Sequence, residues 1–161
     1  MYLPNPLGNV YCTPLAADFD GDGKADPTVY NSANGEWTIA SSSDGYKTVR
    51  LGPFGGTGWM PAGGDGDGDK YADFFVANLE TGQWVVYGTT AGLFMTETNW
   101  LGQPGDMLAL ADYDGDGLAD PAVFRLTEEY DDLFYVRRSA YAYRLAVFRL
   151  ADRGYEEIYE E

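Results

Sequence analysis

The chain has 161 residues with 10 Lys and Arg against 26 Asp and Glu, so its formal net charge is −16. This charge excludes nucleic acid and anionic membranes as natural partners and favours cations. Histidine is absent, which removes the usual general base, the Ser-His-Asp and Cys-His pairs and the commonest zinc ligand. We therefore expect that the protein is not an enzyme.

The composition also indicates the fold class. The chain holds 21 Gly, 8 Pro and 13 Tyr, and no segment carries a sustained apolar stripe at helical spacing. Turns and short strands are the expected elements, with very little helix. We predict an all-β protein.

The start of the chain, residues 1–8, has neither the basic region nor the apolar region of an export signal. No run of 18 apolar residues occurs anywhere, so we expect no membrane insertion. Cys12 is the only cysteine, and it cannot form a disulfide within the chain. We expect a small buried apolar side chain at this position, with an intermolecular disulfide as the alternative.

An acidic motif of nine residues then occurs three times. Residues 18–26 read DFDGDGKAD, residues 65–73 read DGDGDKYAD and residues 112–120 read DYDGDGLAD, with starts 47 residues apart. A fixed period of this length marks an array of structural repeats. We divide the chain into repeat 1 at 1–57, repeat 2 at 58–104 and repeat 3 at 105–161, the last with a divergent C-terminal segment.

Each motif is followed by runs that predict about four strands per repeat. The first runs, at 27–30, 74–77 and 121–124, are β-prone. Turns at 32–35 and 80–82 precede second runs that contain Trp37 and Trp84, and further runs lead to the next motif. Four short strands in 47 residues match one propeller blade. We predict tandem four-stranded antiparallel blades, β-propeller-like, and incomplete as a monomeric ring because a closed propeller needs about 4 to 8 blades.

The tryptophans divide into two classes. Trp37 and Trp84 occupy equivalent positions, and we expect both to pack between neighbouring sheets. Trp59 and Trp100 lie outside this pair and are better candidates for exposed contacts, such as stacking on a sugar.

The third repeat departs from the pattern after Phe124. Its hairpin position at 127–132 lacks glycine, and residues 139–150 predict a long strand or a pairing surface. We expect residues 130–150, rich in Tyr and Arg, to make any contact between copies. The acids at 156–157 and 160–161 predict a solvated end.

The acidic motifs predict metal sites. Acids at positions 1, 3, 5 and 9 of a tight loop point to one centre, and position 7 offers a backbone carbonyl. Ca²⁺ takes about 6 to 8 such hard oxygen ligands, whereas Mg²⁺ prefers a stricter octahedron. Asp and Gly also form plain turns, but four carboxylates without a cation repel one another. Glycine at positions 4 and 6 lets the chain curl, and Lys70 at position 6 makes the second site the weakest.

Over residues 11–126, these loops and runs resemble the FG-GAP or VCBS repeat family, whose integrin-like propeller blades carry a loop of the form Asp-x-Asp-x-Asp-Gly-x-x-Asp. The resemblance implies about three Ca²⁺ ions per chain and an extracellular or cell-surface location. Lys70 and the end of the third repeat depart from the family pattern. The implied ligands are Asp18, Asp20, Asp22, Lys24 and Asp26; Asp65, Asp67, Asp69, Tyr71 and Asp73; and Asp112, Asp114, Asp116, Leu118 and Asp120.

Three functions remain open at this point. The first is a structural or adhesive calcium-binding module that self-associates or binds a surface partner. It would be a part of a longer repeat protein, a pair that completes a six-bladed ring, or a fibre. The second is a carbohydrate-binding or accessory module of a secreted polysaccharide-active protein. The third is a hydrolase that uses paired carboxylates, although the available aspartates are expected to bind metal.

Overall fold

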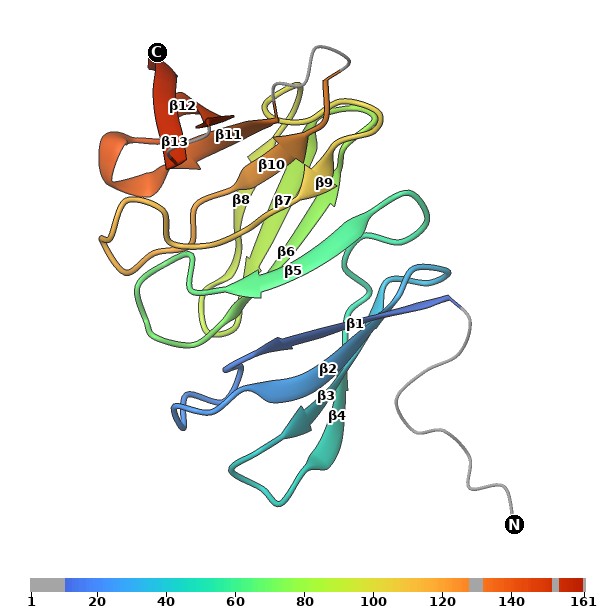
Figure 1. Ribbon diagram of the computed structural model, residues 1–161. Helices are drawn as coiled ribbons and strands as arrows, with labels where there is room; N and C mark the ends of the chain where they lie inside the picture. The colour runs from blue at the N-terminus through green and yellow to red at the C-terminus, as the bar shows by residue number, and fades with distance from the viewer. Residues whose placement is uncertain (1–10, 128–131, 152–153, 161) are drawn as a thin grey trace.

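The computed structural model describes residues 11–127, 132–151 and 154–160, and in these ranges the chain is all-β (Figure 1). Their only helical element is the 3-10 turn η1 (Ser139–Tyr141). The expectation of very little helix is confirmed. Residues 1–8 and 161 and most of the turn at 127–132 lie outside the described residues, so the interpretations that rest on them stay predictions.

Three antiparallel sheets follow one another along the chain. Sheet 1 is β1 (Cys12–Ala17), β2 (Asp26–Asn31), β3 (Glu36–Ser41) and β4 (Lys47–Leu51), hydrogen-bonded in that order. Sheet 2 is β5 (Met60–Gly64), β6 (Asp73–Asn78), β7 (Gln83–Gly88) and β8 (Gly92–Glu97). Sheet 3 is β9 (Met107–Leu108), β10 (Ala122–Arg125), β11 (Leu133–Arg138), β12 (Arg144–Ala151) and β13 (Gly154–Glu160).

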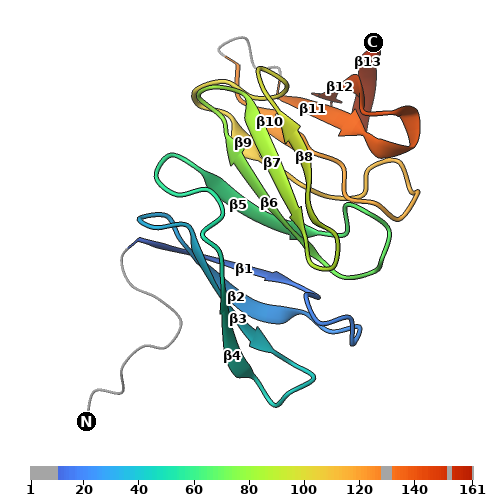
Figure 2. The same cartoon turned by 180° about the vertical axis from the view of Figure 1, so that it is seen from behind.

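Sheet 2 is buried on both faces, between sheets 1 and 3 (Figures 1 and 2). Successive side chains of a strand point to opposite faces. On β6, Phe74 and Val76 join the hydrophobic cluster shared with sheet 1, while Phe75 and Ala77 join the cluster shared with sheet 3. The run of apolar residues on β6 is the pattern of a strand covered on both sides.

The two equivalent tryptophans lie in these clusters, as predicted. Trp37 is 0% exposed and meets Phe74 of sheet 2 edge-on, with ring centroids 5.1 Å apart. Trp84 is also 0% exposed, and its indole N–H donates to the carbonyl of Leu101 over 2.7 Å. Each ring thus fills a contact between two sheets, where an aromatic side chain buries the most surface.

Two predictions about individual side chains are wrong. Trp59 and Trp100 are half-buried rather than exposed, because Trp59 packs against the cluster between sheets 1 and 2 and Trp100 against the other cluster. Both also line open hollows of the surface, so the sugar-stacking interpretation stays a prediction. Cys12 is only partly buried, because it lies on β1, at the edge of its sheet.

The third repeat has a fifth strand, and the predicted long strand at 139–150 begins only at Arg144. The turn η1 occupies its first residues, and Ala142 and Tyr143 then adopt left-handed backbone angles, φ 56° and 60°. Tyr141 and Tyr143 therefore belong to a turn, although their alternation with Leu145 is typical of a strand. Glu156 and Glu157 are exposed, as expected.

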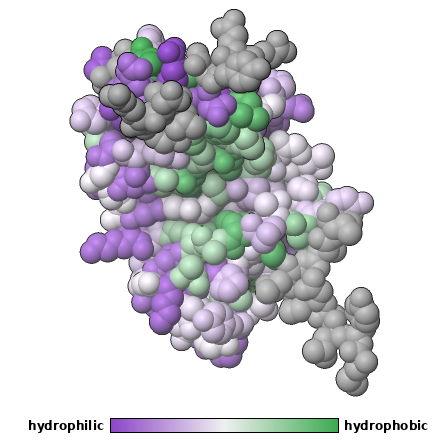
Figure 3. Space-filling view, viewed as in Figure 1, coloured by the Kyte–Doolittle hydropathy of each residue, from purple (hydrophilic) through white to green (hydrophobic). Residues whose placement is uncertain are grey.

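The inner edges of the three sheets come together. β1, β5 and β9 are each the first strand of a sheet and lie at its edge, and β1 contacts β5. Hydrophobic side chains gather along these strands in the middle of Figure 3. Within the described ranges, no helix has the length and apolar character that a membrane span needs.

Candidate metal centres

The three acidic motifs form loops at the same place in each sheet. The loop 18–26 joins β1 to β2, the loop 65–73 joins β5 to β6, and the loop 112–120 follows β9 and leads to β10; we call them loops 1, 2 and 3. In each loop, three carboxylates bring oxygens within 4.8 Å of one another. These groups are Asp18, Asp20 and Asp22; Asp65, Asp67 and Asp73; and Asp112, Asp114 and Asp120.

The remaining predicted carboxylates, Asp26, Asp69 and Asp116, lie outside these groups. Lys24, Tyr71 and Leu118 occupy position 7, where the chain turns because their N–H groups donate to the aspartate two residues earlier, over 2.9, 2.9 and 2.8 Å. Their carbonyl groups stay predicted ligands.

The first aspartate of each loop holds the backbone in its curled shape. One oxygen of Asp18 accepts from Gly21 N–H (2.7 Å) and the other from Gly23 N–H (2.8 Å). Asp65 and Asp112 accept the equivalent pairs of N–H groups. The first carboxylate of each loop thus fixes the curl of its backbone through two N–H groups.

Position 6 needs a left-handed backbone in all three loops. Gly23 and Gly117 have φ 85° and 94°, and Lys70 has φ 74°. The prediction that Lys70 makes the second site the weakest stays a prediction, and the structure places this residue in the left-handed region. A side chain in this conformation costs about 1 to 2 kcal/mol.

Lys70→Gly is expected to raise the free energy of unfolding by about 1 kcal/mol, because glycine adopts positive φ without this cost. Urea denaturation in EDTA measures the change without any contribution from metal. Lys24→Gly is the matched control, since Lys24 lies one position later with ordinary backbone angles. It is expected to destabilise the chain through the added flexibility of glycine and the loss of the ion pair with Asp22. A loss of stability in Lys70→Gly would contradict the prediction.

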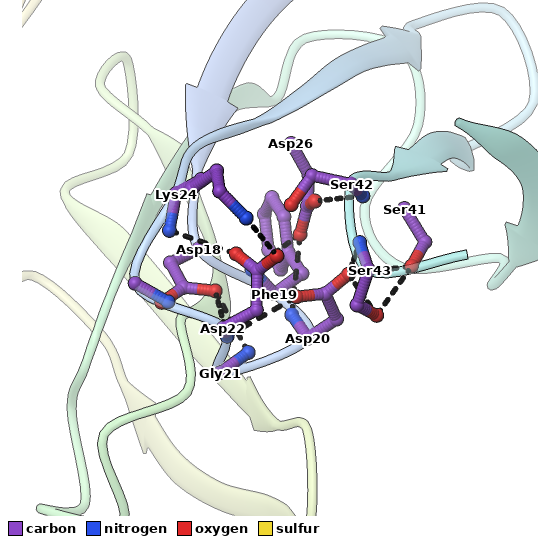
Figure 4. Close-up of polar contacts among 11 residues, drawn as sticks. Asp18, Phe19, Asp20, Gly21, Asp22, Lys24, Asp26, Ser41, Ser42 and Ser43 are labelled. Carbon is purple, nitrogen blue, oxygen red and sulfur yellow. Dashed lines mark hydrogen bonds and ion pairs between the residues drawn. The ribbon is translucent and has the colours of Figure 1, made fainter. Parts of the chain in front are cut away.

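The ninth aspartate is the buried anchor of each loop. Asp26, Asp73 and Asp120 are each 0% exposed. One oxygen of Asp26 accepts from the N–H groups of Phe19 and Asp20 inside the loop, and the other accepts from Ser42 N–H beyond β3 (Figure 4). This side chain thus ties the loop to the outer hairpin of its sheet, and a buried carboxylate requires such partners.

Hydroxyl groups from the outer hairpins also hold the carboxylates. The hydroxyls of Ser41 and Ser43 donate to Asp20 over 2.5 and 2.8 Å (Figure 4). Thr90 donates to Asp69, and the one hydroxyl hydrogen of Ser139 is shared between Asp120 at 2.7 Å and Asp116 at 3.1 Å. Sequence reasoning missed these residues. The available signal was a hydroxyl residue after the third strand of repeats 1 and 2, where Ser43 and Thr90 lie 47 residues apart.

The carboxylates differ in pKa because their surroundings differ. The Ser41 hydroxyl, with the N–H and hydroxyl of Ser43, lowers the pKa of Asp20 to about 2. Burial raises the pKa of Asp73 to about 6, against the lowering effect of two backbone N–H groups. A cation at loop 2 therefore competes with a proton on Asp73 below about pH 6.

No family model matches this chain, and neither curated proteins nor solved structures gave a match. The ligand that the loops suit is therefore inferred from the atoms that they present. They offer carboxylate oxygens, and no sulfur or imidazole of the described residues joins the three groups. Lys24 pairs with a carboxylate of its own loop, because its ammonium lies 2.8 Å from Asp22. Such a donor set is suited to a hard divalent cation that takes several oxygen ligands.

Proposed function

We propose that the protein is an extracellular calcium-binding repeat protein of structural or adhesive function, with one Ca²⁺ in each of its three loops. The observation that carries this proposal is the convergence of three carboxylates at the same place in every sheet. Close carboxylates repel one another, and a divalent cation relieves that repulsion. Ca²⁺ accepts irregular oxygen sets of this kind more readily than Mg²⁺ does.

The sheets act as β-propeller-like blades in this proposal. Face-to-face packing in chain order and inner strands that meet at one edge support a blade arrangement. The ion stiffens each blade because the ninth aspartate joins the loop to the outer hairpin, as in the bonds of Asp120 to Tyr113 and Ser139. The blades then self-associate or bind a surface partner. An extracellular setting follows from the resemblance and from the calcium abundant there.

Isothermal titration calorimetry tests the proposal. The expected result is three Ca²⁺ per chain, with Mg²⁺ binding more weakly. Asp112→Asn is expected to reduce the stoichiometry to two, because it removes a carboxylate of loop 3. Asp44→Asn is the control, since Asp44 is exposed and its carboxylate pairs with Lys47 outside the loops. No binding heat in the intact chain would refute the proposal.

A further inference from the structure

Neighbouring loops are joined to one another by their backbones. The N–H of Ala72, at position 8 of loop 2, donates to the carbonyl of Asp18, at position 1 of loop 1, over 2.7 Å. Ala119 of loop 3 donates in the same way to the carbonyl of Asp65 in loop 2 over 2.6 Å. The same bond therefore accompanies both contacts between sheets.

The side chain at position 7 also contacts the preceding loop. At position 7 of loop 2, Tyr71 lies against Gly21 of loop 1, so closely that a Cβ on Gly21 would come within 2.6 Å of the ring. Leu118 of loop 3 lies beside Gly68 of loop 2, where an added Cβ would be 3.5 Å away. Position 7 of each later loop thus covers position 4 of the earlier loop.

The repeat also defines which sheet face makes each contact. Tyr30 of sheet 1 and Ala77 of sheet 2 are equivalent residues, both 0% exposed and both packed toward the next sheet. The third equivalent, Phe124, lies on the face of sheet 3 that points away from sheet 2, because its neighbour Val123 joins the cluster with sheet 2. We call this the front face of sheet 3: Phe124, Phe134, Val136 and Phe148, joined in register across β10, β11 and β12.

The front face of sheet 3 is apolar and hollowed. A pocket of about 320 Å³ is lined by Tyr113, Phe134, Val136 and Phe148. Phe134 and Phe148 are partly exposed and Tyr113 is 42% exposed, whereas Val136 is 0% exposed. In sheets 1 and 2, the equivalent face is covered by the opposite face of the next sheet.

A face equivalent to the one that covers sheets 1 and 2 is found on sheet 1, on the side away from sheet 2. Pro27 and Val29 of β2 point away from sheet 2, since Thr28 and Tyr30 between them are buried on the sheet 2 side. Thr38 and Ala40 of β3 share their side, because Val29 pairs with Thr38. These four residues are the back face of sheet 1, equivalent to the face that carries Phe74 and Val76 in sheet 2. Pro27 is exposed and Val29 partly exposed, whereas Thr38 and Ala40 are buried at 6% and 5%, so a partner would meet Pro27 and Val29.

Loop 3 has free space at position 4, and loop 1 carries a basic residue at position 7. At loop 3, a Cβ on Gly115 would meet no heavy atom of the described residues within 4 Å, so position 4 has space. At loop 1, position 7 is Lys24, whose side chain is 68% exposed, in place of Tyr71 or Leu118. Lys24, which pairs with Asp22 of its own loop, would therefore stand over the acidic loop 3 if the repeat continued from one chain to the next.

We propose that a second copy of this chain docks head to tail on the first, with its back face of sheet 1 against the front face of sheet 3. Lys24 of the second copy lies over loop 3 of the first, and the position 8 N–H of Ala25 donates to the carbonyl of Asp112. The contact joins different surfaces, so further copies add in the same way or close into a ring. This inference rests on the self-association in the proposed function.

Two lysine substitutions test the docking. Val29→Lys places a charge on the back face, and Phe134→Lys places one in the pocket of the front face. Each variant alone is expected to weaken association by about tenfold or more, because docking would bury an unpaired charge. Val49→Lys is the matched control, since Val49 lies on β4 with 47% exposure and shares the opposite side of the sheet with Ile39. Sedimentation velocity in calcium measures particle size over a range of protein concentrations.

The mixture of the two variants is the decisive sample. Val29→Lys keeps an intact front face and Phe134→Lys an intact back face, so together they form one heterodimer that cannot grow. The proposal would be overturned if Val29→Lys associated as strongly as the wild type. It would also be overturned if the wild-type chain stayed monomeric at every concentration. Circular dichroism checks the folding of both variants, and if Phe134→Lys is unfolded, the comparison of Val29→Lys with Val49→Lys decides. Calorimetry on Val29→Lys gives three Ca²⁺ if only docking is lost, which separates this failure from failure of the calcium proposal.

Discussion

Removal of calcium with EDTA is expected to lower the melting temperature by on the order of 20 °C. An ion that binds only the folded chain at about one hundred times its dissociation constant adds about 2.7 kcal/mol per site. Three independent sites add roughly 8 kcal/mol, and each kcal/mol shifts the melting temperature of a chain of this size by about 2 to 4 °C. Without the ion, the crowded carboxylates also repel one another, which acts in the same direction.

Differential scanning calorimetry in millimolar Ca²⁺, in EDTA and in Mg²⁺ measures this effect. Mg²⁺ is expected to restore less of the stability, because its small octahedral shell fits these loops poorly. Sodium chloride at the same ionic strength as the calcium buffer controls for general screening of the charge of −16. Equal melting temperatures in Ca²⁺ and EDTA would mean that the loops are turns that bind no ion.

The repeat made much of the fold predictable. Alternating residues and turn residues indicate strands directly. The strands that carry Trp37 and Trp84, and the hairpins that they form with the preceding strands, were therefore predictable. The all-β class followed from the same signals. The third sheet was less predictable because Tyr141 and Tyr143 alternate like strand residues while Ala142 takes a left-handed turn. Tyr143 also packs against Trp100, a contact between distant residues that the local pattern does not show.

The candidate sites were predictable in residue type but only partly in geometry. The spacing of acids brings carboxylates together, and three of the four in each loop do converge. The spacing does not reveal which carboxylate is committed to the fold. Asp26 satisfies buried N–H groups from Phe19 and Ser42, a role that depends on a hairpin some 16 residues away. The prediction that Trp59 and Trp100 are exposed was wrong for the same reason, because their burial depends on neighbouring sheets.

Asp120→Ala is expected to lower the free energy of unfolding by about 3 to 5 kcal/mol even in EDTA. The Asp120 carboxylate is fully buried and accepts four hydrogen bonds. The donors are Tyr113 N–H at 2.9 Å, Asp114 N–H at 3.2 Å, Ser139 N–H at 2.6 Å and Ser139 hydroxyl at 2.7 Å. Each buried donor that loses its partner costs about 1 to 3 kcal/mol, and some of these groups regain water.

Asp116→Ala in the same loop separates the two roles of these acids. Asp116 is exposed and accepts from Leu118 N–H, while the Ser139 hydroxyl, which lies closer to Asp120, is 3.1 Å away. Its loss is expected to change stability in EDTA by less than about 1 kcal/mol, because the freed donors reach water. Both substitutions are expected to remove one Ca²⁺ from the calorimetric stoichiometry. If urea denaturation in EDTA gave equal losses for Asp116→Ala and Asp120→Ala, the ninth aspartate would not be the anchor that joins the loop to its hairpin.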